Sequence, residues 1–255
     1  LVYAIQGQFS KVRSFVFIDG IDEVTDDIKN TEDIQDAIHR VNTGSGEVLQ
    51  TVVIANATNV DWEDITTDGV WCYLGDIGNN AGDRTDLRIH RFPLADLTNA
   101  VETVIVDTIR YHYADQTDFT PAYDSTNWDC EAMIALDDSI FLFTKNWLNG
   151  HTNLYALPAI PGVQVALPRG SYNTMGLITS AVRDPGTGTI ALLGHTAVTY
   201  SPFVRVLREY TNHHFFSGTI AAHPIVSPPL QAEAILFHDP TTLIVGSENT
   251  PLNAA

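Results

Sequence analysis

The sequence predicts an all-β fold, a single β-propeller of about five four-stranded antiparallel blades, from three observations. Short runs of β-branched and aromatic residues alternate with clusters of Gly, Asn, Asp and Pro, which is typical of strands and tight turns. A unit of two strands around such a turn recurs along the chain. No apolar run approaches the ~20 residues that a membrane-spanning helix needs.

The strand-like runs follow one another closely along the whole chain. Each is short, and most are bounded by residues that favour turns. They fall at residues 14–18, 48–54, 70–74, 87–92, 103–113, 140–144, 189–193, 204–210 and 242–245.

The repeat is clearest in three copies that carry a glutamate near the start of the first strand, at Glu63, Glu131 and Glu233. A degenerate copy has Leu177 in the equivalent place. In each copy a turn built from Asp, Gly, Ser, Pro or Thr leads into the second strand, as in a hairpin. The spacing between copies varies, which propeller blades tolerate because their connecting loops differ in length.

Third and fourth strands are expected after each hairpin, so each copy extends to a four-stranded blade. The N-terminal strand 1–5 is expected to complete the last blade, whose outer strands are missing. Six blades are the alternative if residues 1–55 contain two partial blades. The predicted blades, in one domain of residues 1–255, cover roughly 14–55, 60–113, 129–170, 175–220 and 231–255.

Polar residues recur at the start of the first strand and at the end of the second strand. These two places lie at the same end of a blade because the two strands pair antiparallel. We therefore expect the polar residues to converge at one mouth of the central channel. The predicted metal ligands are Glu63, Asp76, Asn79, Glu131 and Glu233, and the predicted ligand-binding residues are Asp61, Lys145, Asn146, His195 and Glu248.

Calcium is the cofactor that these residues predict. Several carboxylates at one place repel each other, and a bound cation relieves the repulsion. Oxygen ligands from Asp, Glu and Asn suit Ca²⁺, which accepts six to eight of them in loose geometry. Two alternatives remain open: Lys145 neutralises one of the acids, or the acids cap backbone donors of neighbouring blades.

Three local patterns need separate interpretations. The run 76–86 has closely spaced oxygen side chains but lacks the final glutamate of an EF-hand, so we favour a hydrogen-bonded loop over a calcium loop. His213 and His214 start an outer strand and point to opposite faces, so they do not favour one shared metal ion. His195 is the candidate general base in any catalytic site.

Composition limits the partners. The net charge of -18, from 31 acidic and 13 basic residues, disfavours nucleic acid and suits a cationic ligand, a small molecule or a glycan. The two cysteines, Cys72 and Cys130, are expected as buried free thiols, with one disulfide as the alternative. Few lysines and the sequon Asn56-Ala57-Thr58 favour secretion. The sequence gives no indication of oligomeric state.

One longer pattern resembles a known family. Residues 59–65, followed by 73–80, Arg84 and 87–91, are similar to the DWEDIA…YLGDIGNN pattern of a largely uncharacterised family of secreted β-propeller proteins, found mainly in bacteria. The resemblance covers roughly residues 38–250 and implies the fold and export, but no activity. Family members usually carry Asn-Asp-Ser-Gly before the first hairpin, where this chain has residues 30–33 without the Ser-Gly. More distantly, the channel acids are similar to those of calcium-dependent lactonase and phosphotriesterase propellers.

Three functions follow as hypotheses. The first is a secreted acidic propeller that binds a cation, calcium above all, and a ligand at the channel mouth. The second is a calcium-dependent hydrolase of esters or lactones, in which the ion polarises the substrate and His195 or a carboxylate acts as base. The third is a structural or adhesion module. The sequence alone does not decide whether the protein is an enzyme.

Overall fold

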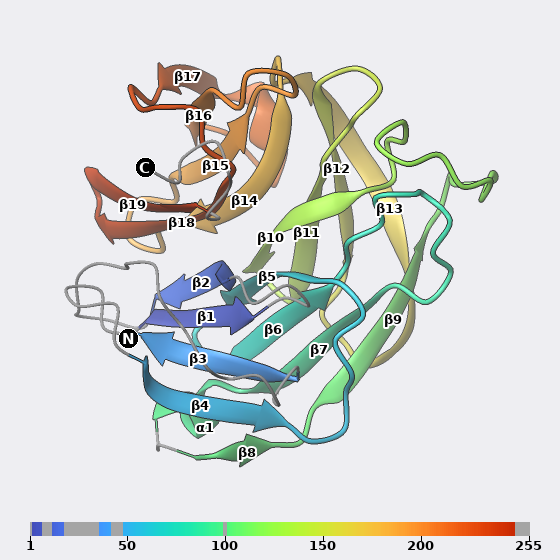
Figure 1. Ribbon diagram of the computed structural model, residues 1–255, viewed down its shortest axis with the longest axis vertical. Coiled ribbons are helices and arrows are strands. Elements are labelled where there is room, and N and C mark those ends of the chain that lie inside the picture. The colour runs from blue at the N-terminus through green and yellow to red at the C-terminus, as the bar shows by residue number, and fades with distance from the viewer. Residues whose placement is uncertain (1, 7–11, 18–35, 42–47, 99–100, 248–255) are drawn as a thin grey trace.

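The computed structural model describes residues 2–6, 12–17, 36–41, 48–98 and 101–247, and its fold is all-β (Figure 1). Its short helical segments are α1 (Leu94–Thr98) and the 3₁₀ turn Phe215–Ser217. Within the described ranges, no helix has the length and apolar character needed to cross a membrane. The strands form four sheets.

The first sheet has the strand order β2-β1-β3-β4-β8. Its N-terminal strand β1 pairs antiparallel with β2 on one edge and with β3 on the other. The prediction that strand 1–5 completes the last unit is therefore wrong, because both edges of this strand are already hydrogen bonded. The strands are β1 (Val2–Gln6), β2 (Val12–Phe17), β3 (Ala37–Val41), β4 (Val48–Ile54) and β8 (Thr103–Val104).

The second sheet has eight strands in the order β10-β11-β12-β13-β9-β7-β6-β5. It consists of two antiparallel four-stranded units, and β13 joins them by pairing parallel with β9. The end strands β5 and β10 also contact each other, so the sheet is nearly closed like a barrel. The strands are β5 (Trp62–Thr67), β6 (Trp71–Asp76), β7 (Arg88–Pro93), β9 (Asp107–Tyr113), β10 (Cys130–Leu136), β11 (Ser139–Thr144), β12 (His151–Pro158) and β13 (Gly162–Asn173).

This parallel pairing departs from the prediction of separate antiparallel units. The reason is the length of β13, which has 12 residues. Its C-terminal part pairs with β12, and its first residues, 162–166, reach the outer edge of β9. A second parallel pair joins β4 to the short strand β8.

The third sheet, β14-β15-β16-β17, is fully antiparallel, as predicted for that part of the chain. Its fourth strand begins at Thr219 and not at His213 and His214, where an outer strand was expected, because the 3₁₀ turn Phe215–Ser217 comes first. The last sheet is the hairpin of β18 and β19. The strands are β14 (Leu177–Arg183), β15 (Ile190–His195), β16 (Pro202–Arg208), β17 (Thr219–Pro224), β18 (Ala232–Asp239) and β19 (Thr242–Ser247).

One strand of each unit belongs to a ring. Strands β2, β5, β10, β14 and β18 contact one another in turn, and β18 contacts β2. Figure 1 shows these strands around the centre of the molecule, with the other strands of each unit farther out. We call these five the ring strands.

The core lies between consecutive units. Separate buried clusters pack around Trp62, around Met133, around Phe143 and around Leu193, each with residues from two neighbouring units. Inner strands are thus covered on both faces, which explains why β11 and β15 are almost continuously apolar and buried. Cys72 and Cys130 are buried free thiols in two different clusters.

Candidate functional site

A β-bulge occurs near the start of four ring strands, and it places one extra residue there. The extra residues are Glu63 in β5, Glu131 in β10, Thr179 in β14 and Glu233 in β18. A bulge bends its strand and re-aims the local side chain. The three glutamates are therefore equivalent, as predicted. In the degenerate copy, the residue equivalent to these glutamates is Thr179, and the prediction of Leu177 is wrong.

The best-defined contact at this end of the ring is a buried ion pair. The Lys145 ammonium donates to both carboxylate oxygens of Glu131, each at 2.8 Å. Glu131 and Lys145 are 4% and 3% exposed. The ammonium also lies 4.8 Å from the ring centre of Trp147. Lys145 therefore neutralises the charge of Glu131. This was one of the alternatives to a bound cation that the sequence left open.

Two further carboxylates act on Lys145. Burial lowers the pKa of Lys145, but the negative charges of Glu131, Glu233 and Asp129 outweigh this effect and raise it. Burial, together with the charge of Glu131, raises the pKa of Asp129 to about 6. The Asp129 carboxylate accepts hydrogen bonds from the backbone of Asn79 and from the Trp147 indole. One ammonium thus faces three carboxylates, which share its charge.

His195 ends β15 on the same side of the ring. Its Nδ1 lies 3.1 Å from the carbonyl oxygen of Thr196. A carbonyl oxygen only accepts, so Nδ1 carries the proton and Nε2 presents a lone pair. Burial and the charge of Lys145 lower the pKa of His195 to about 4, so the imidazole is neutral at pH 7. Its ring stacks on Tyr200, with ring centres 5.1 Å apart.

Nδ2 of Asn146 and Nε2 of His195 are buried here without a hydrogen-bond partner among the described atoms. The Asn146 side chain is otherwise held, because its Oδ1 accepts from the Thr144 hydroxyl at 2.6 Å. Both residues are almost completely buried, at 0% and 2% exposed. Buried polar atoms in proteins are nearly always hydrogen bonded, to protein or to water, so these two atoms need a partner that the described residues do not supply. We call Glu131, Lys145, Asn146, His195 and Glu233 the polar end.

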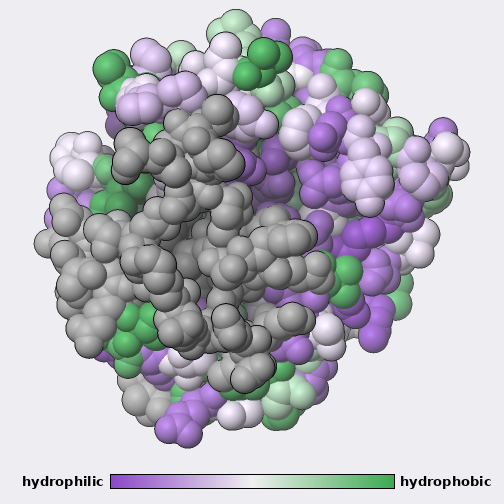
Figure 2. Space-filling model, in the orientation of Figure 1, coloured by the Kyte–Doolittle hydropathy of each residue, from purple (hydrophilic) through white to green (hydrophobic). Residues whose placement is uncertain are grey.

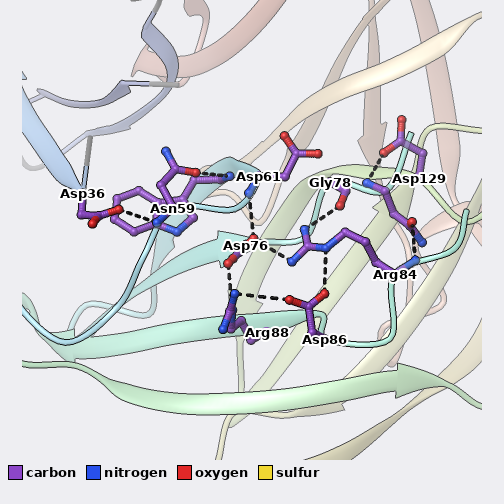
Figure 3. Close-up of polar contacts among 11 residues, drawn as sticks. Asp36, Asn59, Asp61, Asp76, Gly78, Arg84, Asp86, Arg88 and Asp129 are labelled. Carbon is purple, nitrogen blue, oxygen red and sulfur yellow. Dashed lines mark hydrogen bonds and ion pairs between the residues drawn. The ribbon is translucent and has the colours of Figure 1, made fainter. Parts of the chain in front are cut away.

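Asp76 lies in a different cluster (Figure 3). Its carboxylate accepts hydrogen bonds from the Arg84 guanidinium at 2.9 Å, from the Arg88 guanidinium at 2.8 Å and from the backbone N–H of Asp61 at 3.0 Å. Both arginines also contact Asp86. The carboxylate is completely buried, so two guanidinium groups balance its charge in place of a metal ion. The loop 76–86 is thus a hydrogen-bonded loop, as we favoured.

Asn79 belongs to this loop as well. Its Oδ1 accepts from the backbone N–H of Arg84, and its Nδ2 donates to the carbonyl oxygen of Trp128. Its own backbone N–H donates to Asp129, which links the loop to the start of β10 (Figure 3). The amide therefore has a structural role in joining two neighbouring units.

Asp61 and Glu63 lie against Gly78. A side-chain carbon added to Gly78 would fall 2.3 Å from Oδ2 of Asp61 and 2.8 Å from Oε1 of Glu63. A larger residue here would have to displace both carboxylates, because they approach the backbone of Gly78 closely.

The structure separates the predicted set of site residues. Glu131, Lys145, Asn146, His195 and Glu233 lie at the polar end, whereas Asp76 and Asn79 join the arginine cluster. Glu248 lies outside the described residues.

The predicted calcium ligands do not form one donor set in the described part of the chain. The carboxylate of Glu131 forms an ion pair with Lys145. The carboxylate of Asp76 forms ion pairs with Arg84 and Arg88. No group of three or more His, Cys, Asp or Glu side chains is placed there to hold a metal ion. Calcium binding therefore stays a prediction, and Asp76, Asn79 and Glu131 do not fit it.

Sequence reasoning missed several residues that shape these clusters. Trp147 lies two residues after Lys145, but nothing in its spacing indicated the contact with Asp129. Arg88 alternates with Ile89 along β7, so a charge facing Asp76 across the sheet was a readable signal. Thr179 was hidden because its repeat lacks the glutamate.

Other predicted features have structural partners. Nε2 of His213 lies 2.9 Å from Asp137, and His213 precedes a 3₁₀ turn instead of a strand. The side-chain amide of Asn56 donates to and accepts from the backbone of Val106, so the sequon asparagine has a structural role. Figure 2 shows mainly hydrophilic residues over the β6–β7 and β9–β10 connections.

Comparisons with known proteins give little further information. No family model matches the chain, and no curated protein matches it. Among solved structures, the chain is similar to Kuenenia stuttgartiensis hydrazine synthase, with 11% identity over 79% of this chain and a TM-score of 0.35. The chain spans about half, 52%, of that protein. A likeness at this level bears on neither activity nor ligand.

Proposed function

We propose that this chain is a five-bladed β-propeller that binds a hydroxyl-bearing ligand, such as a sugar, at the polar end. The propeller is supported by the ring of β2, β5, β10, β14 and β18 and by the buried clusters between neighbouring units. Export is part of the proposal, and the low lysine content supports it, with Lys145 as one of three lysines in the chain.

The two unpartnered buried atoms carry the proposal. Nδ2 of Asn146 can only donate a hydrogen bond, and Nε2 of His195 can only accept one while Nδ1 is protonated. A hydroxyl group both donates and accepts, so ligand hydroxyls can satisfy both kinds of atom. A carboxylate cannot donate to His195, and an ammonium cannot accept from Asn146. Hydroxyl groups are therefore the chemistry that these atoms select.

The charges nearby fit a neutral, polar ligand. Lys145 is already bound to Glu131, and Glu233 and Asp129 lie within its field. A sugar offers further hydroxyls to these carboxylates without adding a charge to a buried place, which would be costly. Trp147 beside Lys145 adds an aromatic surface at this end.

Calorimetric titration of the protein with a panel of monosaccharides and disaccharides tests this function. We expect at least one sugar to bind the wild type. His195→Phe removes the acceptor, and Asn146→Asp removes the donor but keeps the oxygen that accepts from Thr144. Each should weaken binding by about fivefold, since one hydrogen bond contributes about 1 kcal/mol.

The matched control is His223→Phe, an exposed histidine on β17, which should bind like the wild type. Circular dichroism and melting of each variant show whether it is folded. No binding by any sugar, with equal heats for wild type and variants, would overturn the proposal. Water alone would then satisfy both atoms.

A cation at the same end is the second candidate function. The observation that favours it is the charge balance, one ammonium against Glu131, Glu233 and Asp129. A cation that binds the folded state alone raises the melting temperature, and a chelator lowers it. We expect Glu233→Gln to reduce that response, because Glu233 is not the direct partner of Lys145. A melting temperature that ignores both calcium and chelator would contradict this candidate.

A further inference from the structure

We propose that the opposite end of the ring holds a binding site for a small aliphatic cation, such as a diamine or polyamine. A pocket of about 570 Å³ lies there, between the C-terminal halves of β5, β10, β14 and β18 and the hairpin turns that follow them. Its volume is in the range of small-molecule sites. It shares no residue with the polar end, and we call it the turn-end pocket.

The walls of the turn-end pocket are apolar. Ile65, Ile134, Ala181 and Ile235 stand at related positions of four ring strands and line it. All four are buried, with at most 7% of their surface exposed. Aliphatic walls of this kind gain free energy when methylene groups replace water, at roughly 25 cal/mol per Å² of apolar surface covered. The pocket therefore favours a ligand with a hydrocarbon chain.

The rim of the pocket is acidic. Each of the four hairpin turns contributes one aspartate to the lining. Among the lining residues, Arg183 is the one basic side chain that is charged at every relevant pH. Backbone or hydroxyl donors hold three of the four carboxylates, and His213 contacts the fourth. The rim is therefore a fixed group of negative charges around an apolar hollow. The aspartates are Asp68, Asp137, Asp184 and Asp239.

Charge complementarity selects the head group of the ligand. Hydroxyl and backbone N–H groups of Thr241 lower the pKa of Asp239 to about 2, so this carboxylate is ionised at neutral pH. The Arg183 guanidinium lies over the hairpin turn, 3.6 Å from where a side-chain carbon on Gly188 would stand. One arginine cannot balance four aspartates, so positive ligands are attracted. A chain with ammonium groups at its ends matches both the walls and the rim.

Titration with three six-carbon probes of similar shape tests the assignment. The probes are 1,6-diaminohexane, the neutral 1,6-hexanediol and the dianion hexanedioate. We expect the diamine to bind at least tenfold more tightly than the diol, and the dianion not to bind. The diamine affinity should fall as salt rises, because exposed charges are screened. It should also exceed that of 1,4-diaminobutane, which covers less of the walls.

The variant Asp68→Asn/Asp184→Asn/Asp239→Asn removes three rim charges. Asparagine oxygens still accept the turn hydrogen bonds, so the hairpins should stay folded. The matched control is Asp118→Asn, an exposed aspartate that holds a turn at Thr120 outside the pocket. We expect the triple variant to lose at least tenfold in diamine affinity, while the control keeps it. Equal binding of diamine and diol, or a triple variant that binds like the wild type, would overturn the assignment.

Discussion

The two ends of the ring strands treat charge in opposite ways. At the polar end, Glu131 and Lys145 are almost completely buried and pair with each other at 2.8 Å. At the turn-end pocket, Asp68, Asp137 and Asp239 are exposed, and the walls behind them are aliphatic. A buried charge must find its partner inside the protein, whereas an exposed charge remains available to a ligand. The two ends of the same strands therefore differ in chemistry.

Local backbone structure explains the difference. At the polar end, bulges re-aim Glu131 and Glu233 into a place that the second strands reach with Lys145 and His195. At the turn-end pocket, the hairpin turns need Asp to accept backbone N–H groups, and these turns lie on the surface. The aspartates are thus fixed by turn geometry, and their charge is a consequence of it.

The largest effect is expected from Lys145→Met. The substitution leaves the Glu131 charge buried without its direct partner, which typically costs about 3 to 5 kcal/mol of unfolding free energy. Urea unfolding of wild type and variant measures this cost. Arg169→Met, an exposed arginine of β13, is the matched control and should change stability little.

A second variant separates charge from packing. Adding Glu131→Gln to Lys145→Met should recover a large part of the lost stability, because the unpaired charge is gone. If the single and double variants are equally unstable, packing of the lysine stem explains the loss and the ion pair does not.

A smaller effect should follow from acid. The folded-state pKa of His195 is about 4 and its ordinary value is 6.5, so the unfolded chain takes up this proton first as pH falls. The contribution of His195 to stability is therefore intact above pH 6.5 and is lost as pH falls from 6.5 towards 4. Between pH 7 and pH 5 the wild type should lose about 2 kcal/mol more than His195→Gln.

The control for acid sensitivity is His223→Gln, which replaces an exposed histidine. It should follow the wild type at both pH values in denaturant titrations. A His195→Gln variant that loses as much stability as the wild type on acidification would show that His195 is not buried as described.

Gly78→Ala should cost about 1 to 2 kcal/mol, because the added carbon meets the carboxylates of Asp61 and Glu63. Gly186→Ala is the matched control, since the nearest atom to its added carbon is 3.6 Å away. Thermal melting compares the two variants. Equal melting temperatures would mean that Asp61 and Glu63 move aside without cost.

The smallest effect is expected at the turn-end pocket. Asp184→Asn keeps an oxygen for Thr187 and removes an exposed charge, so stability should change by about 0.5 kcal/mol or less. Urea unfolding at two salt concentrations checks this. A loss as large as that of Lys145→Met would remove the contrast between the two ends.

The sequence predicted the all-β fold and the hairpins of four units well, because turn residues and alternating apolar runs act locally. It also predicted that Glu131, Lys145, His195 and Glu233 share one end, since antiparallel pairing fixes which ends meet. It did not predict the parallel contact of β13 with β9 or the pairing of β1, which depend on strand length and on contacts between distant segments. Thr179 was missed because its copy lacks the glutamate that marks the bulge in the other three.

A crystal structure of the protein soaked with the sugar that binds best tests the central claim most directly. We predict ligand hydroxyls that accept from Nδ2 of Asn146 and donate to Nε2 of His195. In the same structure, Lys145 should still contact both oxygens of Glu131. A metal ion bound between Glu131 and Glu233, with Lys145 turned away, would contradict the account, and so would a sugar bound elsewhere with only water on the two atoms.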